Sequence, residues 1–227
     1  MRAFRACKEG LQADTSPARK PRDRAAALNA GREFEDLKMA DRLNVITIVG
    51  SLRKGSYNAA LARQLPQWQP EGMSITASPP WAGFPIYNAD DQNTTGFPKD
   101  VETLADAIRK ADGVMFVTPE YNYSIPGGLK NAIDWLSRLK DQPFVHKPVA
   151  IQSATGGPLG GGRMQYQLRQ AFVFLDALQF NKPEIFVGMA HTKFDEKTLE
   201  FKDEAGINFI KQQLAGFEKF IRKVTHK

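Results

Sequence analysis

The chain has 227 residues, of which 42% are hydrophobic and 25% are charged, and its formal net charge is +6. These values indicate a globular protein of one large domain or two small ones, and no apolar run approaches the roughly 18 residues that cross a bilayer. The single cysteine excludes a disulfide framework, a cysteine-based zinc site and a cysteine-ligated iron–sulfur cluster within the chain.

The same composition limits the location and the partners. A single cysteine is typical of a reducing compartment, so we expect a cytoplasmic protein. The lack of a membrane-length apolar run predicts no membrane partner. The three histidines have no metal-ligand spacing, so we expect no metal site, and redox chemistry would need a bound organic cofactor. No basic patch is interleaved with aromatic residues, so we expect no nucleic-acid partner. A modest positive field would instead favour anionic substrates.

Residues 1–38 differ from the rest of the chain. They lack apolar periodicity and contain nine Lys or Arg against six Asp or Glu. We predict a disordered or weakly structured basic extension here, followed by one domain over 39–227. The extension has no apolar stretch like that of a secretory signal, and its acidic residues argue against an organellar transit peptide. A role in binding nucleic acid or another partner is the alternative for this segment.

From residue 43 onward, short apolar runs alternate with helical patterns. The predicted strands are 43–50, 73–77, 113–118, 148–153 and 184–188. The predicted helices are 58–68, 98–111, 128–140, 162–178 and 204–224, and 79–97 is predicted to be a loop. Strands that alternate with helices form a parallel sheet with right-handed crossovers. We therefore predict an α/β three-layer sandwich, a five-stranded parallel sheet with helices on both faces.

Ligands of such sheets bind at the carboxyl ends of the strands, which directs attention to the loops after the first, third and fourth strands. The first of these, 50–58, is small, polar and basic, and it opens a helix, where backbone N–H groups and the helix dipole bind anions. Ser51, Ser56 and Asn58 add polar donors, and Arg53 adds a charge. The spacing matches neither the dinucleotide fingerprint nor a Walker A loop, which favours a single phosphate. A plain surface turn with a good helix cap is the alternative.

The loop after the third strand, 118–128, contains two prolines, two glycines and two tyrosines. Aromatic side chains beside exposed backbone suit a planar ring whose edge bonds to main-chain groups. The alternative is a rigid connector in which Tyr121 and Tyr123 cover the edge of the core. Glu120 is a candidate acid or base, although a carboxylate that caps nearby backbone N–H groups explains it as well.

The loop after the fourth strand, 153–162, contains five glycines in ten residues. This glycine content permits either close approach of the backbone to a ligand or mobility. Alone it is a weak signal, and it matters because the topology brings it to the same edge of the sheet as the other two loops.

Two motifs resemble a known family. GSLRKGSYN at 50–58 and PEYNYSIPGGLKNAIDW at 119–135 are similar to the NADPH-dependent FMN reductase family, and within it to the bacterial chromate reductase and quinone reductase branch. The resemblance extends over roughly 43–225, in motif order, and omits 1–38. It implies a flavodoxin-like fold and a non-covalently bound FMN.

The resemblance also implies roles for individual residues. Phosphate-binding positions correspond to Ser51, Arg53, Ser56 and Asn58. Ring-lining positions correspond to Pro119, Glu120, Tyr121 and Asn122. Ser153 corresponds to a further flavin contact, and Tyr57 and Gly156 complete the predicted cofactor-binding set. The family is usually dimeric or tetrameric, and the stretch Arg163–Tyr166 and Glu184 fall where related enzymes make subunit contacts.

The implied activity is transfer of a hydride from NADPH or NADH to flavin N5 and then reduction of quinones, with chromate as a further acceptor, in a ping-pong sequence. No side chain is predicted to be catalytic, because the flavin carries the chemistry. A flavodoxin-type electron carrier is the main alternative, although such carriers are usually strongly acidic and this chain is basic. A P-loop NTPase is excluded because the Lys-Ser/Thr pair is missing.

Overall fold

The computed structural model describes residues 42–226, so the predicted extension over 1–38 lies outside the described residues. The strands are β1 (Leu43–Val49), β2 (Met73–Ala77), β3 (Gly113–Val117), β4 (Pro148–Ala154), β5 (Leu178–Gln179) and β6 (Ile185–Val187). The helices are α2 (Tyr57–Trp68), α3 (Ala89–Thr95), α4 (Lys99–Lys110), α5 (Gly127–Ser137), α6 (Gly162–Phe174), the short 3-10 helix η1 (Ala190–Thr192) and α7 (Glu204–Thr225).

The sheet is parallel throughout, with the strand order β2-β1-β3-β4-β5 and with β6 also paired to β4. The predicted three-layer α/β architecture is therefore confirmed. The predicted strand over 184–188 is present as β6, and one further short strand, β5, which was not predicted, also lies beside β4. β5 pairs with Pro148 and Val149, and β6 pairs with the stretch Gln152–Ala154.

Helix α6 ends earlier than predicted, at Phe174 rather than at residue 178. Asp176 adopts a left-handed backbone conformation with φ of 53°, which an α-helix cannot continue through. Leu178 then donates its N–H to the carbonyl of Lys147 and begins β5. The apolar periodicity extends through this turn, which explains why the pattern alone predicted a longer helix.

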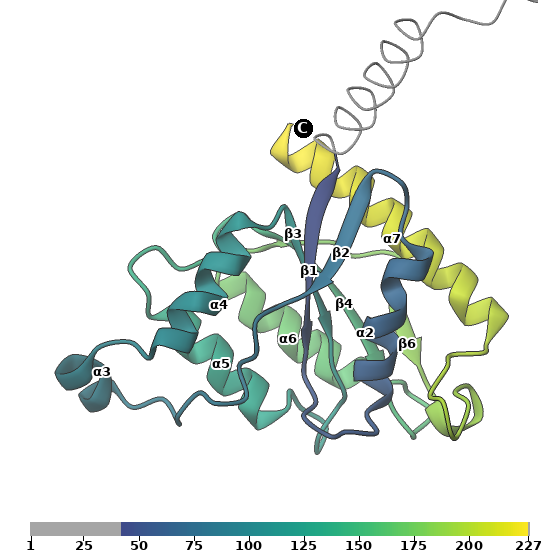
Figure 1. Cartoon of the computed structure of the whole chain (residues 1–227), viewed down its shortest axis with the longest axis horizontal. Helices are drawn as coiled ribbons and strands as arrows, with labels where there is room; N and C mark the ends of the chain where they lie inside the picture. The colour runs from purple at the N-terminus through teal and green to yellow at the C-terminus, as the bar shows by residue number, and fades with distance from the viewer. Residues whose placement is uncertain (1–41, 227) are drawn as a thin grey trace, which may run out of the picture. The chain divides into compact units, whose positions relative to one another are not determined.

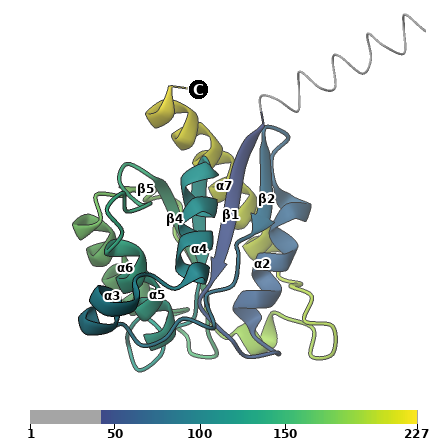
Figure 2. The same ribbon diagram turned by 60° about the vertical axis from the view of Figure 1, so that its left-hand side comes forward.

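Helices cover both faces of the sheet (Figure 1). On one face, α2 and α7 pack on the sheet through a core that includes Leu61, Leu65, Leu214 and Phe217. On the other face, α4, α5 and α6 contribute to a second core, which contains Val101, Leu104, Trp135, Leu168 and Phe172. Figure 2 shows the same division from the side. None of the helices within 42–226 is long and apolar enough to cross a membrane.

Helix α3 lies in the segment predicted to be a loop, and the views of Figures 1 and 2 show it at the periphery. Asn88 caps its start by accepting a hydrogen bond from the N–H of Asp90, and Gly96 ends it with φ of 78°. It has no buried residue. An element without an apolar face leaves no periodicity in the sequence, so only its caps could have predicted it.

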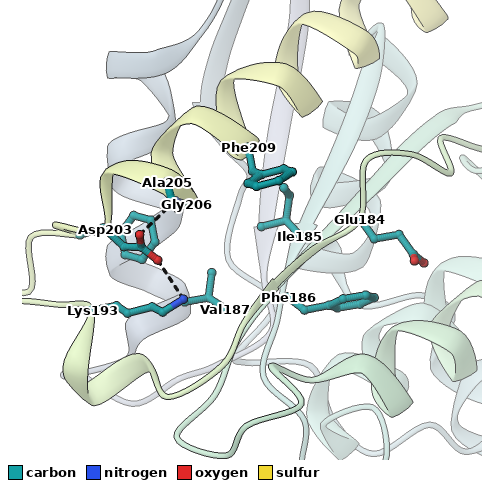
Figure 3. A pocket seen from close by; sticks show the side chains of 10 residues that line it. Glu184, Ile185, Phe186, Val187, Lys193, Asp203, Ala205, Gly206 and Phe209 are labelled. Atoms are coloured by element: carbon teal, nitrogen blue, oxygen red, sulfur yellow. Dashed lines mark hydrogen bonds and ion pairs between the residues drawn. The ribbon is translucent and has the colours of Figure 1, made fainter.

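The beginning of α7 is held by a capping carboxylate. Asp203 accepts a hydrogen bond from the N–H of Gly206 at 3.2 Å and forms an ion pair with Lys193 at 2.8 Å. Figure 3 shows this pair at the edge of a cavity of about 300 Å³ whose wall includes Phe186 and Phe209. The hydrogen bond from Lys193 lowers the pKa of the Asp203 carboxyl below its usual value.

Asp203→Ala should lower the free energy of unfolding by about 1 kcal/mol near neutral pH, because the cap of α7 is lost. Since the folded-state pKa of Asp203 is lowered, its contribution is present above the unfolded-state pKa and is lost as the pH falls through the folded-state value. Urea unfolding at neutral pH and at several values below about pH 4 measures this dependence. The isosteric Asp203→Asn variant, which cannot ionise, is the control. If the difference in unfolding free energy between wild type and Asp203→Asn is the same at every pH, the lowered pKa of Asp203 is contradicted.

Candidate functional site

Three loops that lie far apart in the sequence form one cavity at the carboxyl ends of β1, β3 and β4. The cavity measures about 300 Å³, at the lower end of the range of small-molecule sites. It is lined by Ser51, Arg53, Ser56, Tyr57, Asn58, Pro119, Glu120, Tyr121, Ala154, Thr155 and Gly156. The predicted site residues meet here except for Asn122 and Ser153. Ala154 and Thr155 were not predicted, because their side chains carry no distinctive chemistry.

The loop after β1 ends at the start of α2. Ser56 is the N-cap of this helix, and its hydroxyl accepts the N–H of Ala59 at 3.2 Å. The first N–H groups of a helix have no partner within the helix and carry the positive end of its dipole. Arg53 is exposed beside them, and Ser51 lies within 3.5 Å of the Tyr121 hydroxyl. This end of the cavity therefore has the donors and the charge that bind a phosphate.

Asn58 ties α2 to the end of β4. Its amide nitrogen donates to the carbonyl of Ala154 at 2.7 Å, and its amide oxygen accepts the N–H of Ala154 at 2.9 Å. Only 2% of the residue is exposed. Both halves of the amide therefore bond to backbone, which fixes the distance between two walls of the cavity. This role was not anticipated from the sequence, which suggested only a donor to phosphate.

The loop after β3 makes a tight turn. Tyr121 and Ser124 exchange two backbone hydrogen bonds at 3.0 and 2.9 Å, and the two residues between them, Asn122 and Tyr123, both have positive φ, 49° and 65°. Positive φ at both central positions is the mark of a type I′ turn. Asn122 lies at the exposed tip of this turn and does not line the cavity.

Glu120 caps α6 from outside the helix. Its carboxylate accepts the N–H of Met164 at 3.2 Å and lies 3.4 Å from the guanidinium of Arg163. The N-cap residue Gly161 has no side chain that could do this. A carboxylate at a helix N-terminus also interacts favourably with the dipole. The geometry agrees with the structural interpretation of Glu120 and offers no evidence for an acid or base.

Helix α6 in turn holds the loop after β3 in place. The guanidinium of Arg163 lies 3.9 Å from the centre of the Tyr123 ring, and Gln167 donates to the carbonyl of Tyr123 at 2.9 Å. Tyr166, which with Glu184 was predicted at a subunit contact, is exposed, and its hydroxyl lies 3.4 Å from that carboxylate. The loop after β3 is therefore fastened to the first turns of α6.

Ser153 is fully buried and does not line the cavity. Its hydroxyl bonds to the carbonyl of Gly160 and to the side-chain amide of Gln165. The predicted contact of Ser153 with a ligand is not supported by this arrangement. By contrast, Gly156 lines the cavity, and a side chain at that position would meet no atom within 4 Å, so the backbone there is open to a ligand.

The donor set fits a flat ring that carries one phosphate. The helix start with Ser51 and Arg53 suits the phosphate, and the backbone of Pro119–Tyr121 and Thr155–Gly156 borders the rest of the cavity. The part of the chain that the structure describes contains no group of three or more His, Cys, Asp or Glu side chains that could hold a metal ion. The residues present therefore fit FMN.

Gly50→Ala should disrupt the first loop, because an added Cβ would lie 2.0 Å from the hydroxyl of Thr118 and 2.4 Å from its Cβ. We expect a loss of about 3 kcal/mol in the free energy of unfolding, as for overpacking of a tight core. Gly55→Ala in the same loop is the matched control, since its Cβ would meet nothing within 4 Å, and it should change stability by less than about 0.5 kcal/mol. Urea unfolding of both variants measures the difference. Equal stability would contradict the close packing of Gly50 on Thr118.

Comparison with known proteins places the chain in a family. The model of the NADPH-dependent FMN reductase family matches residues 43–192. A quinone reductase of Escherichia coli strain K12 is 53% identical over 186 residues, which cover 82% of this chain and 99% of that protein. An NAD(P)H-dependent FMN reductase of Pseudomonas aeruginosa is 45% identical, with the same coverage.

The fold leads to the same group. A similar solved structure is that of FerB, a flavoenzyme NAD(P)H:(acceptor) oxidoreductase from Paracoccus denitrificans. The two structures superpose with a TM-score of 0.71 and 29% sequence identity, and the match covers 80% of this chain and 98% of FerB. The two sequence motifs, the parallel sheet and the cavity at its carboxyl edge all agree with this relationship. The chain belongs to the NADPH-dependent FMN reductase family.

Proposed function

We propose that this chain is an oxidoreductase that binds FMN in the cavity formed by the three loops and uses NAD(P)H to reduce quinones. The observation that carries the proposal is the convergence of Ser51, Arg53, Pro119, Tyr121 and Gly156 on one cavity. Membership of the family and the similarity to a quinone reductase support the cofactor and the acceptor class.

The phosphate of FMN would bind at the start of α2. Ser51 and the first N–H groups of the helix donate hydrogen bonds there, and Arg53 adds a charge-assisted contact. Asn58 would act indirectly, because its amide is bonded to Ala154 and keeps the helix start next to β4.

The ring of FMN would lie against Pro119–Tyr121 on one side and Thr155–Gly156 on the other. The turn that contains Asn122 and Tyr123, fastened to α6 through Gln167, keeps the first of these walls rigid. Rigid walls reduce the ordering cost of binding a flat ligand. Glu120 stabilises the start of α6 and thereby the same wall.

When bound, FMN supplies a ring that accepts a hydride from NAD(P)H at N5 and passes two electrons to the acceptor. The protein binds and orients, and no side chain that lines the cavity needs to act as a nucleophile. Because the cavity is small, NAD(P)H and quinone would occupy the open side in turn, and we expect ping-pong kinetics. Chromate is a further proposed acceptor, because the positive net charge of the chain would favour an anion.

A flavodoxin-type electron carrier is the competing function. The basic net charge of the chain argues against it, and so does the similarity to enzymes named as reductases. The two functions differ in one property, since a carrier holds FMN but does not oxidise NAD(P)H by itself.

We also propose a cytoplasmic location, on the basis of cysteine usage, and a homodimer or homotetramer. Large exposed side chains near the cavity support self-association, with Tyr123 63% and Tyr166 57% exposed. The size of the purified protein in solution tests it.

The purified protein should show absorbance maxima at about 370 and 450 nm that bleach when NADPH or NADH is added without oxygen. Addition of a quinone should restore the spectrum. Bound FMN that NAD(P)H does not bleach would favour the electron carrier. A colourless protein that takes up no FMN would refute the proposed function.

Arg53→Gln should weaken FMN binding by about tenfold to a hundredfold, since a charge-assisted hydrogen bond contributes roughly 1.5–3 kcal/mol. Riboflavin, which lacks the phosphate, should bind both proteins equally. Lys54→Gln is the matched control, because Lys54 is also exposed but does not line the cavity. Quenching of flavin fluorescence gives both dissociation constants. An equal loss for FMN and riboflavin would show that Arg53 does not bind the phosphate.

A further inference from the structure

A chain of buried hydrogen bonds closes the loop that follows β4. The side-chain amide of Gln165 donates to the hydroxyl of Ser153 at 2.7 Å and to the carbonyl of Ile185 at 2.8 Å. A carbonyl only accepts, so the nitrogen of the Gln165 amide must face both groups. The Ser153 hydroxyl therefore accepts from Gln165 and donates its own proton to the carbonyl of Gly160. The direction of every bond in this chain is determined.

These bonds join the two ends of the segment 154–160. Ser153 precedes it, and Gly160 ends it with φ of 59°. Gly161 follows with φ of 89°, and an added Cβ there would lie 2.8 Å from the Cβ of Ser153. The segment thus returns onto Ser153 in a conformation that depends on two glycines with positive φ. Its residues Ala154, Thr155 and Gly156 line the cavity.

Gln165 is not the choice that stability alone would favour. It is fully buried, and its amide oxygen has no hydrogen-bond partner among the described residues. An unpaired buried oxygen carries a desolvation cost that an apolar side chain of similar size avoids. What the amide gains in return are the two hydrogen bonds that it donates, and one of them holds Ser153 and with it the segment 154–160.

We propose that Ser153 and Gln165 are positioning residues of the cofactor site, which hold 154–160 in the conformation that receives the ring of the flavin and do not touch the flavin themselves. This inference rests on the proposed function. It assigns to Ser153 a role different from the flavin contact that the family resemblance implies, because its hydroxyl donates to Gly160 and accepts from Gln165, and the residue does not line the cavity.

Gln213 on α7 supplies a matched control. It too is a buried glutamine whose amide bonds to backbone, with its nitrogen donating to Pro183 at 2.8 Å and to Ile151 at 3.2 Å. Its oxygen accepts from the amide of Gln152. None of these bonds reaches 154–160. Replacing Gln213 removes the partner of a buried donor, which lowers stability, but leaves the loop after β4 intact.

The experiment compares Gln165→Met, Ser153→Ala and Gln213→Met with wild type in three measurements. These are the dissociation constants of FMN and riboflavin, the melting temperature of the FMN-free protein, and hydrogen exchange of the amides of 155–161 in the FMN-free protein. For Gln165→Met and Ser153→Ala we expect about tenfold weaker binding of both flavins, the equivalent of one hydrogen bond. Exchange in 155–161 should be faster. The melting temperature of Gln165→Met should stay close to that of wild type, because removal of the unpaired buried oxygen offsets the loss of the two donated hydrogen bonds.

Gln213→Met should behave in the opposite way, with a lower melting temperature, normal exchange in 155–161 and normal flavin binding. The inference is overturned if Gln165→Met binds flavins as wild type does, or if Gln165→Met and Gln213→Met weaken binding equally. A wild-type protein that binds no FMN would instead refute the proposed function and this inference with it. Faster exchange without weaker binding would likewise overturn the inference, because the loop would then be held without consequence for the site.

Discussion

The double hydrogen bond between Asn58 and Ala154 joins two parts of the chain that are 96 positions apart in the sequence. One of these parts is the start of α2, which carries the positive end of the helix dipole. The other is the end of β4, which leads into the glycine-rich segment. Because the amide uses both of its halves, α2 can neither slide along the sheet nor turn about its axis without breaking a buried bond. The cavity exists because these two walls keep a fixed separation.

The other walls depend on each other in a similar way. The loop after β3 is irregular and contains a tyrosine with positive φ, a conformation that is costly for a bulky residue. That cost is offset by contacts with α6, namely the guanidinium of Arg163 over the Tyr123 ring and the amide of Gln167 on its carbonyl. Helix α6 lacks a capping side chain of its own and takes one from Glu120 in that loop. Loop and helix therefore stabilise one another, and neither would keep its shape alone.

Much of this could be predicted from the sequence, and the limits have physical reasons. β1, β3 and β4 are mainly apolar runs and were found with small errors in their ends. The rule that ligands bind at the carboxyl ends of parallel strands identified the loops that meet. The strand β5 was not predicted, because a strand of two residues is too short to show an alternation of apolar and polar side chains. The hydrogen bonds that Asn58 and Ser153 make within the protein could not be predicted, because burial decides which groups a polar side chain meets, and burial depends on the whole fold.

The structure of helix α3 has a consequence for how the length of this part of the chain can change. It begins at a cap supplied by Asn88, ends at Gly96 and buries none of its own residues, so its hydrogen bonds are satisfied locally and nothing in the sheet depends on its length. The segments on either side are anchored separately, because the rings of Tyr87 and Phe97 both pack against Trp135 in the core. The stretch between these anchors should therefore tolerate insertions and deletions while the sheet and the cavity keep their structure.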